Sequence, residues 1–301
     1  MLQLANRTAY AVKLLVLPDR RGADAAVLIV QGSFGLADGR PLDAQAPLID
    51  ADAWAGEPGA SPLVEASDVA LEKPSTDVLL EGIARPEGGH AQPSFTTAFA
   101  VGAVRKTVRV VGPRAWRKTW FGERAGAAEP VDAVPLAWER AAVGERPPAL
   151  EHPERPVTRR KRAPEAWGGC GPIPGTWQPR RAHAGTYDER WQRSRAPWLP
   201  EDFDPRFFQV APPDQIAPTH LQGGEPIELW GCHPAGDFRG ALPVRRPVCA
   251  FDVDGTVQRP PLRLDTVRLR PEADEVRLVW RTMLPLGRRM LRLRTVEVAD
   301  G

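Results

Sequence analysis

The chain has 301 residues with 40 basic and 38 acidic side chains, and its formal charge of +2 indicates neither a nucleic-acid nor a membrane surface. Apolar residues make up 42% of it, enough to bury a core, whereas its 33 prolines exclude a structure made mainly of long helices. No stretch approaches the roughly 20 apolar residues of a membrane span, and no signal peptide is visible. With only three cysteines, we expect reduced thiols in a cytoplasmic protein.

Residues 1–122 predict an N-terminal β-rich half. Apolar, β-branched runs at 9–18 and 25–36 end at turn signals, as strands do. Residues 94–112 alternate on both sides of Gly102 and predict a hairpin.

Residues 123–175 predict a Pro/Arg-rich loop or linker, because prolines and charges replace any periodicity. The run Arg159-Arg160-Lys161-Arg162 is typical of either a nucleic-acid patch or a solvated linker, and without interleaved aromatic residues the linker is favoured. A mildly acidic segment that includes Asp68 is expected to be a solvated loop.

Residues 176–301 predict a C-terminal β-rich half that contains an aromatic-proline segment. Thr186 and Glu189 fit a capping box at the start of a short helix, with Tyr187 and Trp191 one turn apart and Pro197 at its end. The last eighty residues alternate apolar and charged side chains, as antiparallel strands with one solvated face do. We therefore predict a mostly β fold of antiparallel sheets, sandwich-like or built as two packed β-rich halves, with few short helices and one family domain overall.

Residues 248–261, VCAFDVDGTVQRPP, contain the spelling of an aspartyl-phosphate motif, in which the first Asp would attack phosphorus. Such an enzyme needs a helix and a downstream Lys after the motif, but no Lys follows Asp254. Asp254-Gly255 is instead a preferred central pair of a type I′ turn, so we predict a hairpin here.

Other motifs predict neither a metal nor a cofactor. Prolines remove two amide donors from the glycine-rich run at 168–175, and no Walker lysine follows it. Cys232-His233 is an adjacent pair of soft ligands, but the chain has no C-x-x-C or H-E-x-x-H spacing.

Lys73, Pro74, Thr76 and Asp77 lead directly into a predicted strand. A Lys–Asp pair at this spacing is either catalytic or a buried bridge that fixes the start of the strand. We favour the bridge.

Two stretches carry a family resemblance: KPSTDVLLEGIARP at 73–86 and GTWQPRRAHAGTYDERWQRSRAPWLPEDFDPRFFQVAPPDQ at 175–215. They resemble a bacterial domain-of-unknown-function family encoded beside type VI secretion spike genes, and the resemblance covers nearly the whole chain. It implies an adaptor or chaperone that loads toxic effectors, through a PAAR-domain protein or the trimeric spike protein. It assigns no catalytic residue. The residues that match the family pattern are Lys73, Pro74, Thr76, Asp77, Gly185, Thr186, Tyr187, Asp188, Trp191, Pro197, Leu199, Pro200, Asp202, Phe203, Asp204, Asp265, Trp280 and Arg281.

The aromatic residues fit either of two roles. Trp191, Trp198, Phe203 and Phe207 are expected to fill the core between two sheets, or else to bind a partner together with Tyr187. We expect a non-enzymatic cytoplasmic adaptor that holds an apolar or strand-edge segment of a client, without nucleic-acid or membrane partners. The alternatives are an enzyme with an unfamiliar site at Lys73 and Asp77, or a structural component of the secretion apparatus.

Overall fold

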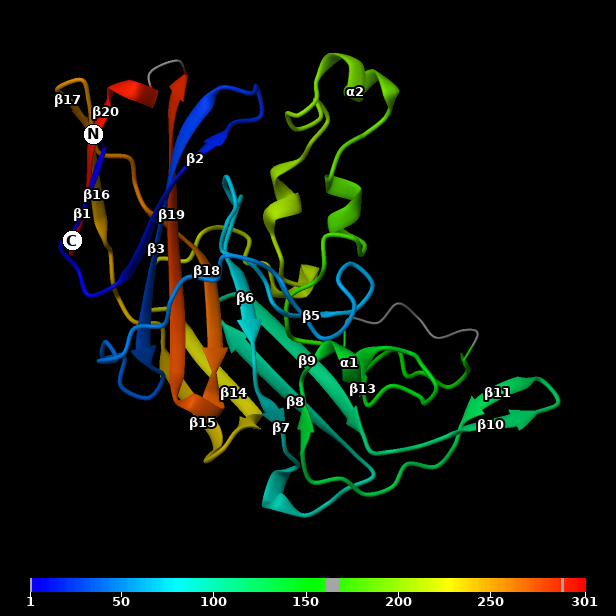
Figure 1. Ribbon diagram of the computed structural model, residues 1–301. Coiled ribbons are helices and arrows are strands. Elements are labelled where there is room, and N and C mark those ends of the chain that lie inside the picture. Colours follow the sequence, from blue (N-terminus) through cyan, green and yellow to red (C-terminus); the bar gives the residue numbers. More distant parts are fainter. Residues whose placement is uncertain (1, 161–167, 288–289) are drawn as a thin grey trace.

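The computed structural model describes residues 2–160, 168–287 and 290–301 (Figure 1). The protein is mostly β, with 42% strand and 11% helix in several antiparallel sheets, which confirms the predicted fold class. The two α-helices among the described residues are short: α1 (Trp138–Ala141) and α2 (Glu189–Ser194). None of the described helices combines the length and the apolar character needed to cross a bilayer.

The main sheet joins strands from both ends of the sequence. Its five strands, in spatial order, are β2 (Ala11–Pro18), β3 (Asp24–Gly35), β19 (Glu275–Gly287), β18 (Arg263–Arg270) and β6 (Asp77–Leu80). The long strands β3 and β19 pair antiparallel along their whole length, whereas β6 runs parallel to β18. Residues 25–30 of β3 are completely buried, as expected for a central strand covered on both faces.

Two further sheets complete the architecture. The second sheet contains β13 (Leu150–Glu151), β9 (Val104–Val111), β8 (Ser94–Val101), β14 (Pro226–His233) and β15 (Gly236–Ala241). The third contains β1 (Gln3–Asn6), β20 (Leu293–Ala299), β16 (Val248–Val253) and β17 (Thr256–Gln258). The predicted hairpin around Gly102 is present as β8–β9, with Gly102 at a positive φ of 56°.

One large apolar core lies between these sheets. Leu28 of β3, Val108 of β9 and Val296 of β20 belong to the same buried cluster, so all three sheets contribute to it. Tyr10, Phe34 and Trp280 form an aromatic group within it, with ring centroids 5.9 to 6.4 Å apart. Burial of this continuous core is the main stabilising contribution to the fold.

Short ordered elements lie in the segments between the main sheets of the described chain, including the described part of the predicted linker. Three two-stranded sheets occur: β4 (Ala53–Trp54) with β5 (Leu63–Glu65), β7 (Ile83–Ala84) with β12 (Val134–Pro135), and β10 (Trp116–Thr119) with β11 (Gly122–Ala125). Short 3₁₀ helices are η1 (Glu87–Gly89), η3 (Arg180–His183), η4 (Pro205–Phe208), η5 (Pro213–Gln215), η6 (Pro271–Ala273) and η7 (Met290–Arg292). Within the described part of the predicted linker, Leu136, Trp138 and Leu150 are buried, and Leu136 and Leu150 belong to the core between the sheets.

The DVDGT stretch is a hairpin, as predicted. Asp254 and Gly255 both have positive φ, 56° and 82°, and connect β16 to β17. The Asp252 carboxylate accepts a hydrogen bond from the Gly255 amide at 2.7 Å, which stabilises the turn. The strand that follows is antiparallel, where an aspartyl-phosphate enzyme would need a helix.

Candidate functional site

Lys73 and Asp77 form the buried bridge that their spacing predicts. The Lys73 ammonium donates hydrogen bonds to the Asp77 carboxylate and to the Thr266 hydroxyl, each at 2.8 Å. The Val210 amide donates a further bond to the same Asp77 oxygen. Both side chains are almost fully buried, at 2% and 0% exposure, so the bridge fixes the start of β6 against β18 and the chain at Val210.

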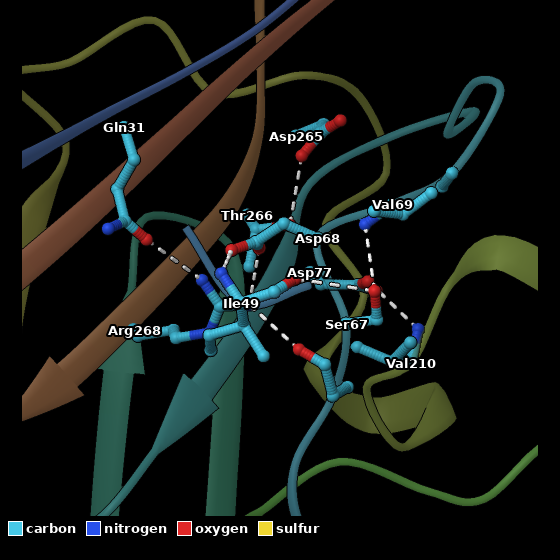
Figure 2. Close-up of polar contacts among 12 residues, drawn as sticks. Gln31, Ile49, Ser67, Asp68, Val69, Asp77, Val210, Asp265, Thr266 and Arg268 are labelled. Atoms are coloured by element: carbon cyan, nitrogen blue, oxygen red, sulfur yellow. Dashed lines mark hydrogen bonds and ion pairs between the residues drawn. The ribbon is translucent and has the colours of Figure 1, made fainter. Parts of the chain in front are cut away.

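This bridge belongs to a larger set of charges, the buried ion-pair network: Lys73, Asp77, Asp265, Arg281, Asp68 and Arg268. Thr266 continues the chain of contacts by donating to Asp265, whose other oxygen accepts from Arg281 Nε at 2.5 Å. Arg281 donates to the carbonyls of Asp68 and Ala70. Figure 2 shows part of this network, drawn around Asp77, Thr266 and Arg268.

The Asp68–Arg268 pair extends the network under the main sheet. Arg268 donates to Asp68 at 2.6 Å, and the other Asp68 oxygen accepts from the Ile49 amide (Figure 2). Asp68 is only 2% exposed, so the expectation of a solvated acidic loop is wrong at this residue. The network contains three cations and three carboxylates, and this balance makes the burial of six charges tolerable.

The neighbouring pattern residues brace the same strand start. The Thr76 hydroxyl donates to the Leu264 carbonyl at 2.5 Å and accepts from the Leu221 amide. Pro74 is exposed and lies in the bend that separates Lys73 from β6. Thr76 therefore attaches the start of β6 to β18 and to the chain at Leu221.

An open cleft of about 480 Å³ lies against one end of the network. Lys73, Asp265 and Arg281 line it together with His220 and Arg263. The pKa of His220 is lowered, because its half-burial outweighs the hydrogen bond to the Lys73 carbonyl. Arg281 Nη2 has no hydrogen-bond partner among the described residues. The cleft thus combines buried, paired charges with an imidazole whose pKa is lowered.

The second group of predicted residues lies in the aromatic arm, defined here as residues 175–208, which stands beside the sheets (Figure 1). Asp188 is the N-cap of α2, because its carboxylate accepts from the Trp191 amide at 2.8 Å. The capping box predicted for Thr186 and Glu189 is therefore wrong. Thr186 instead donates through its amide and hydroxyl to Asp202.

These local bonds fix the exposed end of the arm. The rings of Tyr187 and Trp191 meet edge to face with centroids 4.8 Å apart, and the Trp191 indole donates to the Trp198 carbonyl. Hydrogen bonds from Thr186 lower the pKa of Asp202, and those from Arg206 lower the pKa of Asp204. Tyr187 and Trp198 remain 54% and 39% exposed on this frame.

The base of the arm is an aromatic cluster of its own. Phe203 is buried and packs with Phe207 and Phe208 at centroid distances of 5.2 to 6.1 Å. Phe203 and Phe207, like Trp191 and Trp198, do not belong to the core between the sheets, so they do not fill it as predicted. The Trp198 ring lies against Gly22 in the β2–β3 turn, close enough that a Cβ there would be 3.0 Å away.

The predicted residues thus fall into two places. Lys73 and Asp77 lie in the buried ion-pair network with Thr76 beside it, whereas Tyr187, Trp191 and Trp198 lie in the arm. Sequence reasoning missed Thr266 and Arg268 and placed Asp68 in a solvated loop. Within the described part of the chain, no three His, Cys, Asp or Glu side chains are grouped so that they could hold a metal ion.

The fold and these contacts define a mostly β protein with six buried, paired charges at its main sheet and an aromatic arm beside it. The chain belongs to the family described as "Uncharacterized protein conserved in bacteria (DUF2169)", which matches residues 21–147 and 142–281. Neither a curated protein nor a solved structure matches the chain.

Proposed function

We propose that the protein is a non-enzymatic adaptor or chaperone that binds a type VI secretion effector, a PAAR-domain protein or the trimeric spike protein in the cytoplasm for loading. The observation that carries this proposal is the aromatic arm, which leaves Tyr187 and Trp198 exposed on a frame tied by internal hydrogen bonds. Aromatic side chains supply much of the binding energy at protein interfaces.

The construction of the arm favours binding because its surface is ordered before a partner arrives. Asp188 caps α2, Asp202 holds Thr186, and the Trp191 indole is bonded to the backbone at Trp198. A preorganised surface loses less conformational entropy on association. The arm can therefore present its rings at low entropic cost.

The buried ion-pair network supports a structural role for Lys73 and Asp77. The Lys73 ammonium already donates to two acceptors, and its side chain is 2% exposed. A nucleophile or general base needs a substrate within hydrogen-bond reach. Buried and internally bonded, this pair is better suited to holding β6 in place.

Co-purification tests the proposal. The tagged protein is expressed together with a type VI effector and a PAAR-domain protein from the same genome, as wild type, Tyr187→Ala or Tyr187→Phe. We expect wild type and Tyr187→Phe to retain at least one of these proteins, and Tyr187→Ala to retain about tenfold less at an unchanged melting temperature. Recovery of the wild type alone under gentle conditions, with effector export unchanged by its deletion, would refute the proposal.

An enzymatic role is the second candidate, and the cleft beside Lys73 is the observation that favours it. Asp77→Asn is a poor test, because this fully buried residue also supports the fold. His220 lines the cleft and is half-buried. In His220→Gln, an enzyme would lose function while it kept client binding and stability. An adaptor would keep all three.

A further inference from the structure

The β10–β11 hairpin projects away from the sheets (Figure 1) and carries its most apolar residues at the tip. Trp120 is fully exposed and Phe121 is 80% exposed. Four residue pairs, from Trp116↔Ala125 to Thr119↔Gly122, fix the register of the two strands. The Trp116 indole also donates to the Gly144 carbonyl at 3.2 Å. An ordered ladder therefore holds two large rings in water, where they contribute no burial to the fold.

Basic residues from two distant parts of the sequence gather on this hairpin. Arg117 and Lys118 lie in β10 and Arg124 lies in β11. The backbone of Arg159 pairs with that of Arg124 in an isolated antiparallel β-bridge. None of these four forms an ion pair with another described residue, whereas Arg160 pairs with Glu123 at 3.0 Å. Lys161 and Arg162 of the basic run lie outside the described residues. The fold thus supplies the aromatic neighbours that the basic run lacks in the sequence.

This concentration of charge makes the hairpin surface basic. The described residues 114–124 and 159–160 hold six basic side chains and one acidic one. The whole chain has 40 basic and 38 acidic residues, so the remainder has 34 and 37. Exposed charges act over roughly 8 Å at physiological salt, so a basic hairpin attracts an anionic partner on its own.

We propose that the β10–β11 hairpin, with Arg159, binds an acidic protein segment that carries apolar side chains. Trp120 and Phe121 contact the apolar side chains, and the surrounding guanidinium and ammonium groups contact the carboxylates. This contact rests on the proposed adaptor function, in which the acidic segment belongs to the client. The hairpin and the aromatic arm are then two separate binding surfaces on one adaptor (Figure 1).

The arrangement of the tip favours a polypeptide over the other anionic partners. Single-stranded nucleic acid is bound by rings spaced along a groove, whereas Trp120 and Phe121 are adjacent in one turn. A phosphate backbone or an anionic bilayer would also lie against Glu123, whose charge is already balanced by Arg160, so this part of the hairpin attracts neither. A protein segment can place polar side chains opposite Glu123 and carboxylates opposite the cations.

Fluorescence anisotropy with a labelled peptide tests the inference. The probe is a peptide of about 16 residues that alternates Asp or Glu with Leu, and its matched control has Lys at the acidic positions. We expect the wild type to bind the acidic peptide alone. Trp120→Ser/Phe121→Ser and Arg117→Glu/Lys118→Glu should each weaken binding about tenfold or more. Leu291→Ser, which removes an 85% exposed side chain elsewhere, should bind as wild type, and all variants should keep the wild-type melting temperature.

Three results would overturn the inference. The first is no binding of the acidic peptide, and the second is binding by both hairpin variants as tight as by the wild type. The third is binding of an oligothymidylate or of phosphatidylglycerol vesicles through the same residues that is tighter than binding of the peptide. Its failure differs from failure of the adaptor role. If the effector or PAAR-domain protein co-purifies equally with the hairpin variants and the peptide does not bind, the adaptor role stands alone. If the peptide binds while neither protein co-purifies, the hairpin specificity stands alone.

Discussion

Lys73→Met removes one charge from the buried ion-pair network and keeps most of the side-chain volume. The Asp77 carboxylate, 0% exposed, then keeps only the Val210 amide as a hydrogen-bond donor. Loss of one partner from a buried pair costs about 3–5 kcal/mol, because the remaining charge stays desolvated. We therefore expect the free energy of unfolding to fall by that amount. Urea unfolding followed by the fluorescence of the ten tryptophans measures it.

The chain offers a matched control with the same spacing and the opposite burial. Glu189 and Arg193 also form an i,i+4 pair, but their side chains are 88% and 76% exposed. Arg193→Met should cost about 0.5 kcal/mol or less. Asp77→Asn alone should cost about as much as Lys73→Met, because it too leaves a buried charge without its partner. The double variant Lys73→Met/Asp77→Asn should be no less stable than Lys73→Met, so the coupling energy between the two residues is about 3 kcal/mol or more. A cost for Lys73→Met as small as that for Arg193→Met would show that water solvates the bridge and would contradict the expected desolvation cost.

Three further predictions concern the thiols, the arm and acid stability. Burial raises the pKa of Cys170 and Cys249 to about 12 and that of Cys232 to about 11, so no thiol should react quickly with Ellman's reagent in the folded protein near pH 8. All three should react in urea, and one fast native thiol would contradict the burial. Asp188→Ala should cost about 1 kcal/mol in α2 alone, seen as faster amide exchange there with unchanged protection of β3 and β19; uniform loss of protection would show that the cap supports the whole fold. Burial raises the pKa of Glu275, but hydrogen bonds from Arg277 and Arg270 outweigh it and leave the pKa below its usual 4.5. The stability from Glu275 is therefore present above that value and lost as pH falls through the folded pKa, so Glu275→Gln should be less stable at neutral pH and lose less on acidification. Parallel pH curves for the two proteins would contradict this.

The strands were predictable because their signals are local. Apolar runs and turn residues identify β2, β3 and the β8–β9 hairpin. The Asp254-Gly255 pair predicts a turn, and both residues have the positive φ that such a turn requires. The pairing of β3 with β19 was not predictable, since no local pattern relates Asp24 to Gly287. The two-residue strands β12 and β13 are too short for any periodicity, so 123–175 carried only the composition of a linker.

The candidate site was predictable to the same extent. Lys73 and Asp77 are four residues apart, and the approach to a strand limits where their side chains can lie. Asp68 and Arg268 are 200 residues apart, so only the folded chain relates them. At α2, Thr186 and Asp188 are both good N-cap residue types, and the folded chain uses Asp188 as the cap while the Thr186 hydroxyl donates to Asp202.

Because β3 pairs with β19, the main sheet can be completed only after the C-terminal part of the chain has been synthesised. Gly35 pairs with Glu275, so β3 leaves the ribosome roughly 10–50 s before its partner strand at about 5–20 residues per second. During that interval β3 has only β2 beside it, and an isolated hairpin is marginally stable in water. The nascent chain is therefore most open to aggregation before β19 is made. Substitutions that weaken the β2–β3 hairpin should lower the yield of folded protein more than they lower its stability once folded.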